Sequence, residues 1–380
     1  MITTWKKILF IFNPVAGKSQ IRNHLLDIIE TLSAADYEVV CYPTTKQGDA
    51  RRIARERMGD YLYVVCAGGD GTLDEVVSGM MENPDKPFVP VGYIPAGTTN
   101  DFASSLRIPT DMIQAARVVA HGRTFRCDLG QFNDKDYFTY VAAFGLFTGT
   151  SYQTPQELKN QLGHFAYILQ GISELGQMHA YQMHVRALVP RDEDVPAEYV
   201  VKELGTDAQG TGESSPEDLL PEKIQVLQPE QAAGNEAEGQ TFVSGDGEDA
   251  EETDGKWIEF DGEFALGLIT NSRSIGGFQN ITGQQVDLQD GLFEVTLVRM
   301  PKNPLEVSEI LMSISNPDMK NSMVESFKTS RISLTCDERI AWTRDGEYGG
   351  SHKQVDLRIR PGQLRILVPE QYAEQAESGM

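Results

Sequence analysis

A glycine-rich loop between an apolar strand and a helix is the feature that most limits how this chain can fold. Residues Tyr61–Cys66 are apolar and rich in β-branched and aromatic side chains, which predicts a buried strand. The loop GGDGT (68–72) follows directly, and Leu73, Val76 and Val77 then recur at helical spacing. Glycines let a backbone approach a ligand closely, and a helix N-terminus offers unpaired N–H groups. The stretch therefore predicts a site for an anion, most often a phosphate.

Asp70 within this loop changes what the site can do. A carboxylate repels a phosphate that the loop binds directly, so Asp70 is better suited to act through a cation or on the proton of a nucleophile. The pattern matches neither GxGxxG nor GxxxxGK[ST], which excludes the standard dinucleotide and P-loop fingerprints. A tight turn with an incidental Asp is the competing interpretation. Two adjacent glycines followed by a third exceed what packing requires.

Strands and helices alternate over the first domain, which we place at residues 1–125. The alternation predicts a parallel sheet with helices on both faces, and ligands bind outside the carboxyl ends of such strands. Strands are expected at Ile8–Phe12, Tyr37–Tyr42, Tyr61–Cys66 and Val89–Ile94, and helices at Ile21–Leu32, Asp49–Arg57 and after the GGDGT loop. The loops NPVAG (13–17), TT (44–45), GGDGT and PAGTTND (95–101) all follow strands. We therefore expect them to gather at one edge of the sheet.

The pattern changes after a helix at 111–120, and residues 126–370 are expected to form a second domain. Several of its segments alternate polar and apolar residues, which predicts a largely antiparallel β-sandwich. Strands are expected at 125–130, 137–147, 181–189, 257–269, 292–298, 331–335, 355–359 and 363–368, with helical insertions at 158–178 and 304–328. Residues 371–380 are expected to be a frayed tail.

Charge is distributed unevenly along the chain. The net charge of −23 and a pI near 4.6 argue against general nucleic-acid binding. Residues 191–256 hold 19 acidic and 4 basic side chains, so they carry most of that charge. Such a composition cannot bury enough apolar surface to offset the entropy of ordering. We expect a disordered acidic insertion at about 191–255, and we favour a solvated segment over a partner-binding one.

Cysteine usage and hydropathy point to the cytoplasm. The four cysteines are far apart in the chain and lack metal-type spacing, which predicts buried free thiols in a reducing compartment. No apolar stretch approaches the ~20 residues that span a bilayer. Any membrane contact must then be peripheral. The stripe of apolar residues in the 158–178 helix could face a membrane, although a core position is favoured.

Three motifs in the first domain occur in the same order in one known family. NPVAGK (13–18), GGDGTLDEVVSG (68–79) and PAGTTNDFA (95–103) resemble the diacylglycerol kinase catalytic superfamily, most closely its soluble bacterial diacylglycerol kinases. The resemblance covers nearly the whole chain except 191–255 and the tail. Its further motifs are CDLG (127–130), TPQELKNQLGHFAYILQGI (154–172), GLITNSRSIGGF (267–278), LQDGLFEV (288–295) and DGEYGG (345–350).

The resemblance implies a fold and an activity. The fold is an α/β nucleotide-binding domain plus a β-sandwich domain, with the active site in the interdomain cleft. The activity is transfer of the γ-phosphoryl group from ATP to the hydroxyl of diacylglycerol, which gives phosphatidic acid and requires Mg²⁺. It further implies a lipid substrate met at the membrane surface and a homodimer.

The resemblance also assigns roles to residues. The catalytic residues would be Glu347, Asp70 and Asp101, with Glu347 as the base of the DGE motif, although DGEYGG by itself indicates only an exposed turn. The residues implied to bind the nucleotide and its ion are Asn13, Pro14, Val15, Ala16, Gly17, Thr44, Gly69, Asp70, Gly71, Thr72, Leu73, Asp74, Glu75, Thr98 and Asp128. The competing roles are a helix N-cap for Asp101 and a turn residue for Asp128.

A second cation site is implied in the turn before residue 293. There Asp290 would supply a carboxylate, with Asp287 and Leu292 at backbone carbonyl positions for a structural Mg²⁺. An ordinary Asp-Gly hairpin turn is the alternative.

Other functions remain open at this stage. The named residues recognise phosphates and a hydroxyl group rather than acyl chains. A sphingoid base, an isoprenoid alcohol or a glycolipid is therefore an alternative acceptor. NAD kinase is disfavoured by the motifs PAGTTND and DGEYGG. A non-catalytic nucleotide sensor is disfavoured because Asp70, Asp101 and Glu347 are all present.

Overall fold

The structure is a computed structural model. It describes residues 6–83, 88–145, 179–201, 255–275, 278–279, 286–303, 305–306, 309–310, 313 and 321–377. The predicted helix at 158–178 and all but the first residues of the predicted insertion lie outside these residues.

The first part of the chain forms a parallel sheet, as its alternating pattern predicted. The strands lie in the order β2–β1–β3–β4 and every neighbouring pair is parallel. Their bounds are β1 (Lys6–Phe12), β2 (Tyr37–Pro43), β3 (Tyr63–Gly68) and β4 (Val91–Pro95). The chain runs outward from β1 to β2 and then returns past β1 to β3. The strand order therefore reverses between β1 and β3, where ligands of open α/β sheets bind.

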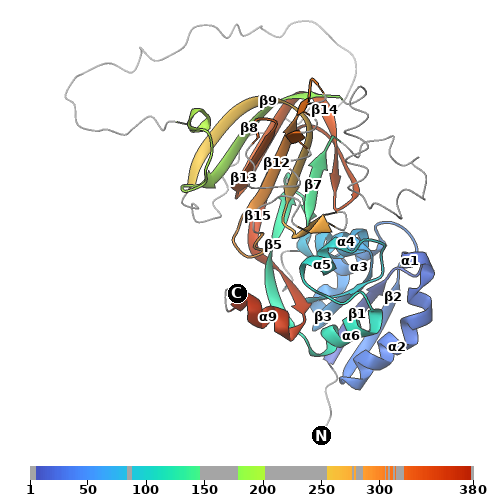
Figure 1. The fold of residues 1–380 in the computed structure, drawn as a ribbon. Coiled ribbons are helices and arrows are strands. Elements are labelled where there is room, and N and C mark those ends of the chain that lie inside the picture. The colour runs from blue at the N-terminus through green and yellow to red at the C-terminus, as the bar shows by residue number, and fades with distance from the viewer. Residues whose placement is uncertain are drawn as a thin grey trace, which may run out of the picture. The chain divides into compact units, whose positions relative to one another are not determined.

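Helices cover this sheet as two packed pairs, α2 with α6 and α3 with α4 (Figure 1). The right-handed crossover rule places the two pairs on opposite faces. The helices are α1 (Ala16–Ser19), α2 (Ile21–Ala34), α3 (Asp49–Arg57), η1 (Met58–Asp60), α4 (Asp70–Met81), α5 (Asp101–Ser105) and α6 (Met112–His121). In the α3–α4 pair, a Cβ added to Gly79 would lie 2.1 Å from the Arg51 carbonyl oxygen, so only glycine permits this close approach.

Antiparallel strands dominate the second part. They are β5 (Arg123–Phe132), β6 (Asp136–Phe138), β7 (Val141–Phe144), β8 (Tyr181–Pro190), β9 (Gly255–Thr270), β10 (Ser274–Ile275), β11 (Phe278–Gln279), β12 (Phe293–Arg299), β13 (Val324–Thr329), β14 (Arg331–Arg344) and β15 (Glu347–Val368). Two further helices are η4 (Ala197–Tyr199) and α9 (Glu370–Glu377). The chain is therefore α/β followed by a β-rich part.

The β-rich part differs from the predicted sandwich of separate sheets. Among the described residues, its strands and the parallel strands are hydrogen-bonded into one 13-stranded sheet, while β10 and β11 pair apart from it. The link is β15, which pairs with β14 and β5 and meets β4 at Ile366 and Val91. At 22 residues, β15 is long enough to exchange partners along its length. The sequence pattern had split it into two strands at 355–359 and 363–368.

A second hydrophobic core lies within the β-rich part and is rich in aromatic rings. Trp342 is buried between Phe132 and Phe144, and Phe138 stacks on Phe293. This core holds β14 and β7 in place, and their ends lead into the site described below.

Four further predictions need correction. Residues 324–329 form β13 rather than the end of a helix, because they pair with β12. Residues 370–377 form α9, whose Tyr372 packs edge-on against Phe125, so this stretch is not a frayed tail. Cys41 is exposed, whereas the other three free cysteines are buried.

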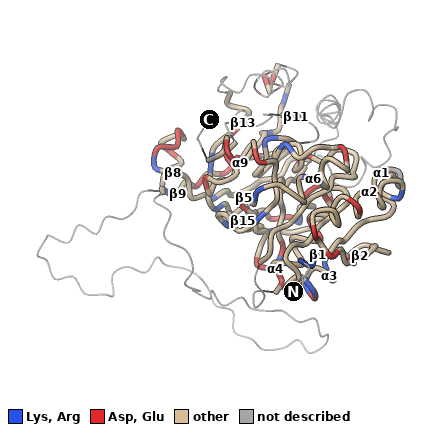
Figure 2. Tube along the Cα trace, turned by 90° about the horizontal axis from the view of Figure 1, so that it is seen from below, with Lys and Arg blue, Asp and Glu red and all other residues tan. Residues whose placement is uncertain are grey.

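The fourth correction concerns the start of the acidic insertion, which was predicted near residue 191. Residues 191–201 belong to the described structure, and Tyr199 stacks on Phe260. The paired strands β8 and β9 flank the remainder. Over the described residues, acidic and basic positions are interspersed (Figure 2).

Candidate active site

Three loops meet at the carboxyl ends of β1, β3 and β4. A Cβ added to Gly97 would lie 2.6 Å from the Gly69 Cα atom, and one added to Gly17 would lie 2.2 Å from the Ala96 carbonyl oxygen. Gly17 also has a positive φ of 54°. Glycine is therefore required where the loops cross. The predicted convergence of NPVAG, GGDGT and PAGTTND is confirmed by these contacts.

The loop after β1 presents backbone groups at this edge. The Asn13 side chain accepts a hydrogen bond from the Val15 N–H at 3.0 Å, and the Asn13 N–H bonds to the Ala67 carbonyl at 2.9 Å. The predicted turn at 13–18 already contains α1, which begins at Ala16. Val15 is 63% exposed, so its side chain is free of the core.

The two predicted threonines follow β2 and β4. The Thr44 N–H bonds to the Phe12 carbonyl at 2.9 Å, which places Thr44 beside the end of β1. Thr98 is exposed in the loop after β4. Both hydroxyls therefore lie on the edge of the sheet where the loops gather.

Asp70 is the first residue of α4 and lies at the centre of the loops. Its carboxylate accepts hydrogen bonds from the Tyr93 hydroxyl at 3.3 Å and from the Asp101 N–H at 3.1 Å. Burial, together with the nearby Asp101 carboxylate, raises the pKa of Asp70 to about 7. These donors are neutral groups and do not balance the negative charge of an ionised Asp70.

Asp101 begins α5 and is 2% exposed. Its Oδ1 accepts a hydrogen bond from the Ser274 hydroxyl at 2.8 Å, so the β-rich part contributes directly to its surroundings. The competing prediction of an N-cap role is wrong. The N-cap is Asn100, which has a positive φ of 54° and whose Oδ1 accepts from the Gly97 N–H at 2.9 Å.

Glu347 comes from the hairpin between β14 and β15. Arg344 pairs with Glu347, and the two residues between them, Asp345 and Gly346, have positive φ values of 46° and 82°. These angles are typical of the two-residue Asp-Gly turn of tight hairpins. The turn carries Glu347 to the GGDGT loop: a Cβ added to Gly71 would lie 3.1 Å from Glu347 Oε1. The predicted base thus faces the first turn of α4.

Asp345 fixes this turn, and the sequence analysis did not identify it as a site residue. Its carboxylate, 3% exposed, accepts from the Thr139 N–H at 2.6 Å and hydroxyl at 2.8 Å, and from the Tyr140 and Val141 N–H groups at 3.0 Å each. Thr139 and Tyr140 lie in the interruption between β6 and β7, and Val141 begins β7, where a continuous strand at 137–147 had been expected. The Asp-Gly pair of DGEYGG was the available signal.

Two buried tyrosines line the same region and were also missed. Tyr93 donates to Asp70, as described above. A Cβ added to Gly346 would lie 3.6 Å from the Tyr140 hydroxyl oxygen. Burial and the neighbouring carboxylates, Asp70 foremost, raise the pKa of Tyr140 well above its ordinary value. Both phenols therefore stay protonated, and nothing in a single apolar strand distinguishes such a tyrosine from a core residue.

The remaining predicted residues of α4 have different surroundings. Leu73 is fully buried in the core. The Glu75 carboxylate accepts from the N–H groups of Gly48 at 2.7 Å and Ala50 at 3.2 Å, so it caps α3. Burial and the carboxylate of Asp345 raise the pKa of Asp74, which places Asp74 at the contact between α4 and the DGE turn.

Asp128 lies with a second acidic cluster rather than with Asp70. Its two oxygens accept from the N–H groups of Gly291 and Gly362, at 2.7 Å each. Burial, with smaller contributions from Asp290 and Asp287, raises the pKa of Asp128 to about 6, although the two hydrogen bonds act to lower it. The competing prediction of a turn residue is wrong, because Asp128 lies within β5.

This second cluster already contains a cation. Asp290 accepts from the Leu292 N–H at 3.0 Å and from Lys328 Nζ at 2.8 Å, and the same ammonium lies 3.4 Å from buried Glu294. Asp287 accepts from the Gln289 N–H at 3.0 Å. Asp290 and Leu292 thus have protein partners where a structural Mg²⁺ had been predicted. Within the described ranges, no three His, Cys, Asp or Glu side chains form a group that could hold a metal ion.

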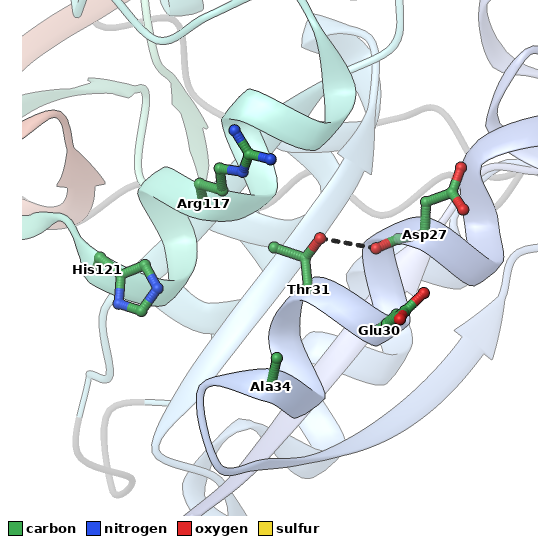
Figure 3. A pocket seen from close by; sticks show the side chains of 6 residues that line it. All are labelled: Asp27, Glu30, Thr31, Ala34, Arg117 and His121. Atoms are coloured by element: carbon green, nitrogen blue, oxygen red, sulfur yellow. Dashed lines mark hydrogen bonds between the residues drawn. The ribbon is translucent and has the colours of Figure 1, made fainter.

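A cavity of about 420 Å³ lies elsewhere, between α2 and α6 (Figure 3). It is lined by Asp27, Glu30, Thr31, Ala34, Arg117 and His121, and the Thr31 hydroxyl donates to the Asp27 carbonyl. None of the predicted site residues lines it.

The converging loops provide the parts needed for phosphoryl transfer. Phosphates can bind to backbone N–H groups at glycine-rich loops and at the start of α4. The paired carboxylates of Asp70 and Asp101 suit Mg²⁺, which proteins usually bind through one or two carboxylates together with substrate phosphates. The carboxylate of Glu347 faces this loop from β15.

Comparisons with known proteins give the same family. Residues 7–132 match the family model described as "Diacylglycerol kinase catalytic domain". A diacylglycerol kinase of Staphylococcus saprophyticus is 40% identical over 347 residues, covering 91% of this chain and 90% of that protein. One from Bacillus subtilis is 27% identical and covers 98% of this chain and 99% of that protein.

A solved structure supports the fold alone. The crystal structure of a diacylglycerol kinase from Bacillus anthracis covers 97% of this chain and 98% of its own, with a TM-score of 0.65 and 19% identity. In the part of the chain that the structure describes, no helix is both long and apolar enough to cross a membrane.

Proposed function

The chain belongs to the diacylglycerol kinase family, and from this premise we propose how its residues carry out the reaction. It is an enzyme that transfers a phosphoryl group from ATP to the hydroxyl of diacylglycerol. The observation that carries the residue assignment is the position of Glu347 Oε1, 3.1 Å from where a Gly71 side chain would begin.

The loops after β1, β3 and β4 bind the triphosphate. Their backbone N–H groups, at Asn13–Gly17 and Gly69–Thr72, neutralise phosphate charge without a side chain that must be desolvated. Thr44 and Thr98 offer hydroxyls at the same edge. Asp70 and Asp101 hold Mg²⁺, which when bound neutralises charge on the transferring phosphoryl group.

Glu347 is the general base. It accepts the proton of the lipid hydroxyl while the hydroxyl oxygen forms a bond to the γ-phosphorus and the bond from phosphorus to the bridging oxygen of ADP breaks. Asp345 holds the turn so that Glu347, although exposed, faces the GGDGT loop. The site then lies in a cleft between an α/β domain ending near residue 125 and the β-rich part.

The lipid acceptor determines where the enzyme works. Diacylglycerol lies in a bilayer, so we propose peripheral contact of a cytoplasmic protein with the membrane surface. We also propose that the protein is a homodimer. We further propose a structural Mg²⁺ at Asp290, where the ion would share the carboxylate with Lys328.

Radiolabel transfer from ATP to lipids in mixed micelles tests the assignment. We expect label in phosphatidic acid for the wild type and none for Glu347→Gln, with ATP binding retained because the substitution removes a charge outside the phosphate loops. Asp70→Ala is the negative control. Wild-type rates in Glu347→Gln would refute the role of Glu347 as general base. Label found preferentially in a sphingoid base, an isoprenoid alcohol or a glycolipid would refute diacylglycerol as the acceptor.

A further inference from the structure

We propose that Asp136 is a positioning residue that ties the turn carrying Glu347 to the helix pair carrying the GGDGT loop. The inference rests on the proposed role of Glu347. Asp136 is the first residue of β6 and was not among the predicted site residues.

One oxygen of Asp136 lies between two guanidinium groups from different parts of the chain. Asp136 Oδ1 is 3.4 Å from Arg51 Nη2 on α3 and 3.2 Å from Arg344 Nη1 on β14. Arg344 is the last residue of β14 and is the hairpin partner of Glu347. The carboxylate therefore joins α3 to the residue that enters the catalytic turn.

The α3 side of this bridge is held firmly. Arg51 donates from Nε to Glu82 Oε1 at 2.6 Å, and its Nη2 lies 2.5 Å from the same oxygen, just beyond the end of α4. The Arg51 backbone also packs against Gly79, as described above. Because α4 begins with Asp70, a shift of Arg51 moves the helix that presents the phosphate loop.

The β14 side is held as well. The Arg344 side chain is 14% exposed, donates to the Tyr137 carbonyl at 3.3 Å and lies over the Phe132 ring at 5.5 Å. The next residue, Asp345, is fixed by its four hydrogen bonds to residues 139–141. The charges of Asp345 and Arg344 also act on the pKa of Asp74 in α4, and Asp136 adds an ion pair that joins this side to α3.

Because Asp136 is partly exposed, its effect on catalytic rate can be measured apart from its effect on stability. The side chains of Asp136 and Arg51 are 37% and 32% exposed, and water weakens the contribution of such ion pairs to stability. Catalysis is more sensitive, because a displacement of about 1 Å in a reacting group can cost on the order of a hundredfold in rate. Loss of this bridge should therefore lower the rate more than it lowers stability.

The test compares Asp136→Asn with Asp136→Glu and with Glu56→Gln. The last breaks the Arg52–Glu56 ion pair, 3.3 Å long, which lies wholly within α3. We expect Asp136→Asn to lower kcat about tenfold with KM for ATP unchanged. Asp136→Glu should recover part of kcat, and Glu56→Gln should match the wild type. Melting temperatures of Asp136→Asn and Glu56→Gln should agree.

Salt provides a second measurement, because screening weakens exposed ion pairs. Added NaCl should lower kcat of the wild type toward that of Asp136→Asn while leaving the variant nearly unchanged. Combining Arg51→Gln with Asp136→Asn should cost no more in kcat than the larger single effect, since both remove the same bridge.

The outcomes are distinguishable from failure of the proposed function. If Asp136→Asn keeps wild-type kcat while Glu347→Gln is inactive, the positioning role is refuted and the base stands. If Glu347→Gln is active, the base itself fails. A kcat loss that follows a fall in melting temperature, ignores salt and is not eased by Asp136→Glu would assign Asp136 a purely structural role.

Discussion

Two clusters of carboxylates in this chain differ in the groups that lie against their negative charge. At the converging loops, Asp70 accepts hydrogen bonds from a phenol and an amide, which are neutral donors. In the second cluster, Asp290 and Glu294 share the ammonium of Lys328. The hydrogen-bond donors to Asp70 bring no positive charge, whereas the second cluster contains the ammonium of Lys328. From this difference we predict that the first cluster serves ligand binding and the second serves folding.

The largest expected effect is on kcat, which should fall for a substitution at the first site and stay nearly unchanged for one in the second cluster. Glu347→Gln should lower kcat by on the order of 10² to 10⁴, the range for loss of general base catalysis. Glu294→Gln should change kcat less than about twofold, because burial raises the pKa of Glu294 to about 8 and the neutral amide resembles the protonated carboxyl. Steady-state kinetics at pH 7 measure both. Comparable losses of kcat in the two variants would show that the two clusters do not differ in their role in catalysis.

Asp345→Asn should have the next largest effect. An amide nitrogen cannot accept the hydrogen bonds that Asp345 receives from residues 139–141, so buried donors lose their acceptor. We expect a loss of about 3 kcal/mol in the free energy of unfolding. Urea denaturation monitored by circular dichroism measures it. A loss below about 1 kcal/mol would mean that the turn is held by other contacts.

Lys328→Met should destabilise the second cluster without directly contacting Asp70 or Asp101. It leaves Asp290 and the fully buried Glu294 without their shared ammonium. We expect about 2 kcal/mol of destabilisation at pH 8, less at pH 6 where Glu294 is protonated. Lys328→Arg serves as the charge-conserving control. Equal destabilisation at both pH values would show that the pairing with Glu294 contributes little.

The smallest expected effect concerns pH. The pKa of about 7 for Asp70 lies above its ordinary value of 3.8, so between these pH values the folded protein holds a proton that the unfolded chain releases. Stability contributed by this group is therefore present at low pH and declines as the pH rises from about 4 to 7. Asp70→Asn should remove the decline and raise stability at pH 8 by about 1 kcal/mol when no divalent ion is present.

Thermal unfolding across this pH range, with EDTA, checks that prediction. Added Mg²⁺ should raise the melting temperature of the wild type more than that of Asp70→Asn, since an ion bound only to the folded state stabilises it. An identical Mg²⁺ response in both proteins would place the ion elsewhere and break the comparison between the clusters.

Much of the parallel sheet could be predicted because its signals are local. The helix at Asp49–Arg57 was predicted with the bounds observed, and β1 and β2 were placed within two residues. The β-rich part was harder, since β14 and β15 exchange partners along their length and no periodicity marks where a strand bends. Residues 324–329 had helical spacing, yet pairing with β12 makes them a strand.

The same distinction applies to the site, where local signals could be predicted and long-range contacts could not. Convergence of the glycine loops followed from their positions after parallel strands. The assignment of Glu347 depended on a resemblance, because an exposed Asp-Gly turn carries no sign of what it faces. Asp128 was grouped with Asp70 by motif, but its hydrogen bonds to Gly291 and Gly362 group it with Asp290.

By itself, the sequence determined the strand–loop–helix unit, the parallel sheet and the edge of the sheet where the glycine-rich loops gather, because glycine conformations and side-chain periodicity act between near neighbours. Only the tertiary structure decided that Asp345 anchors Glu347, that Lys328 neutralises the second cluster, and that Asp136 lies between Arg51 and Arg344. Those contacts join residues up to about two hundred positions apart. Their partners are set by strand register and packing, which no local pattern encodes.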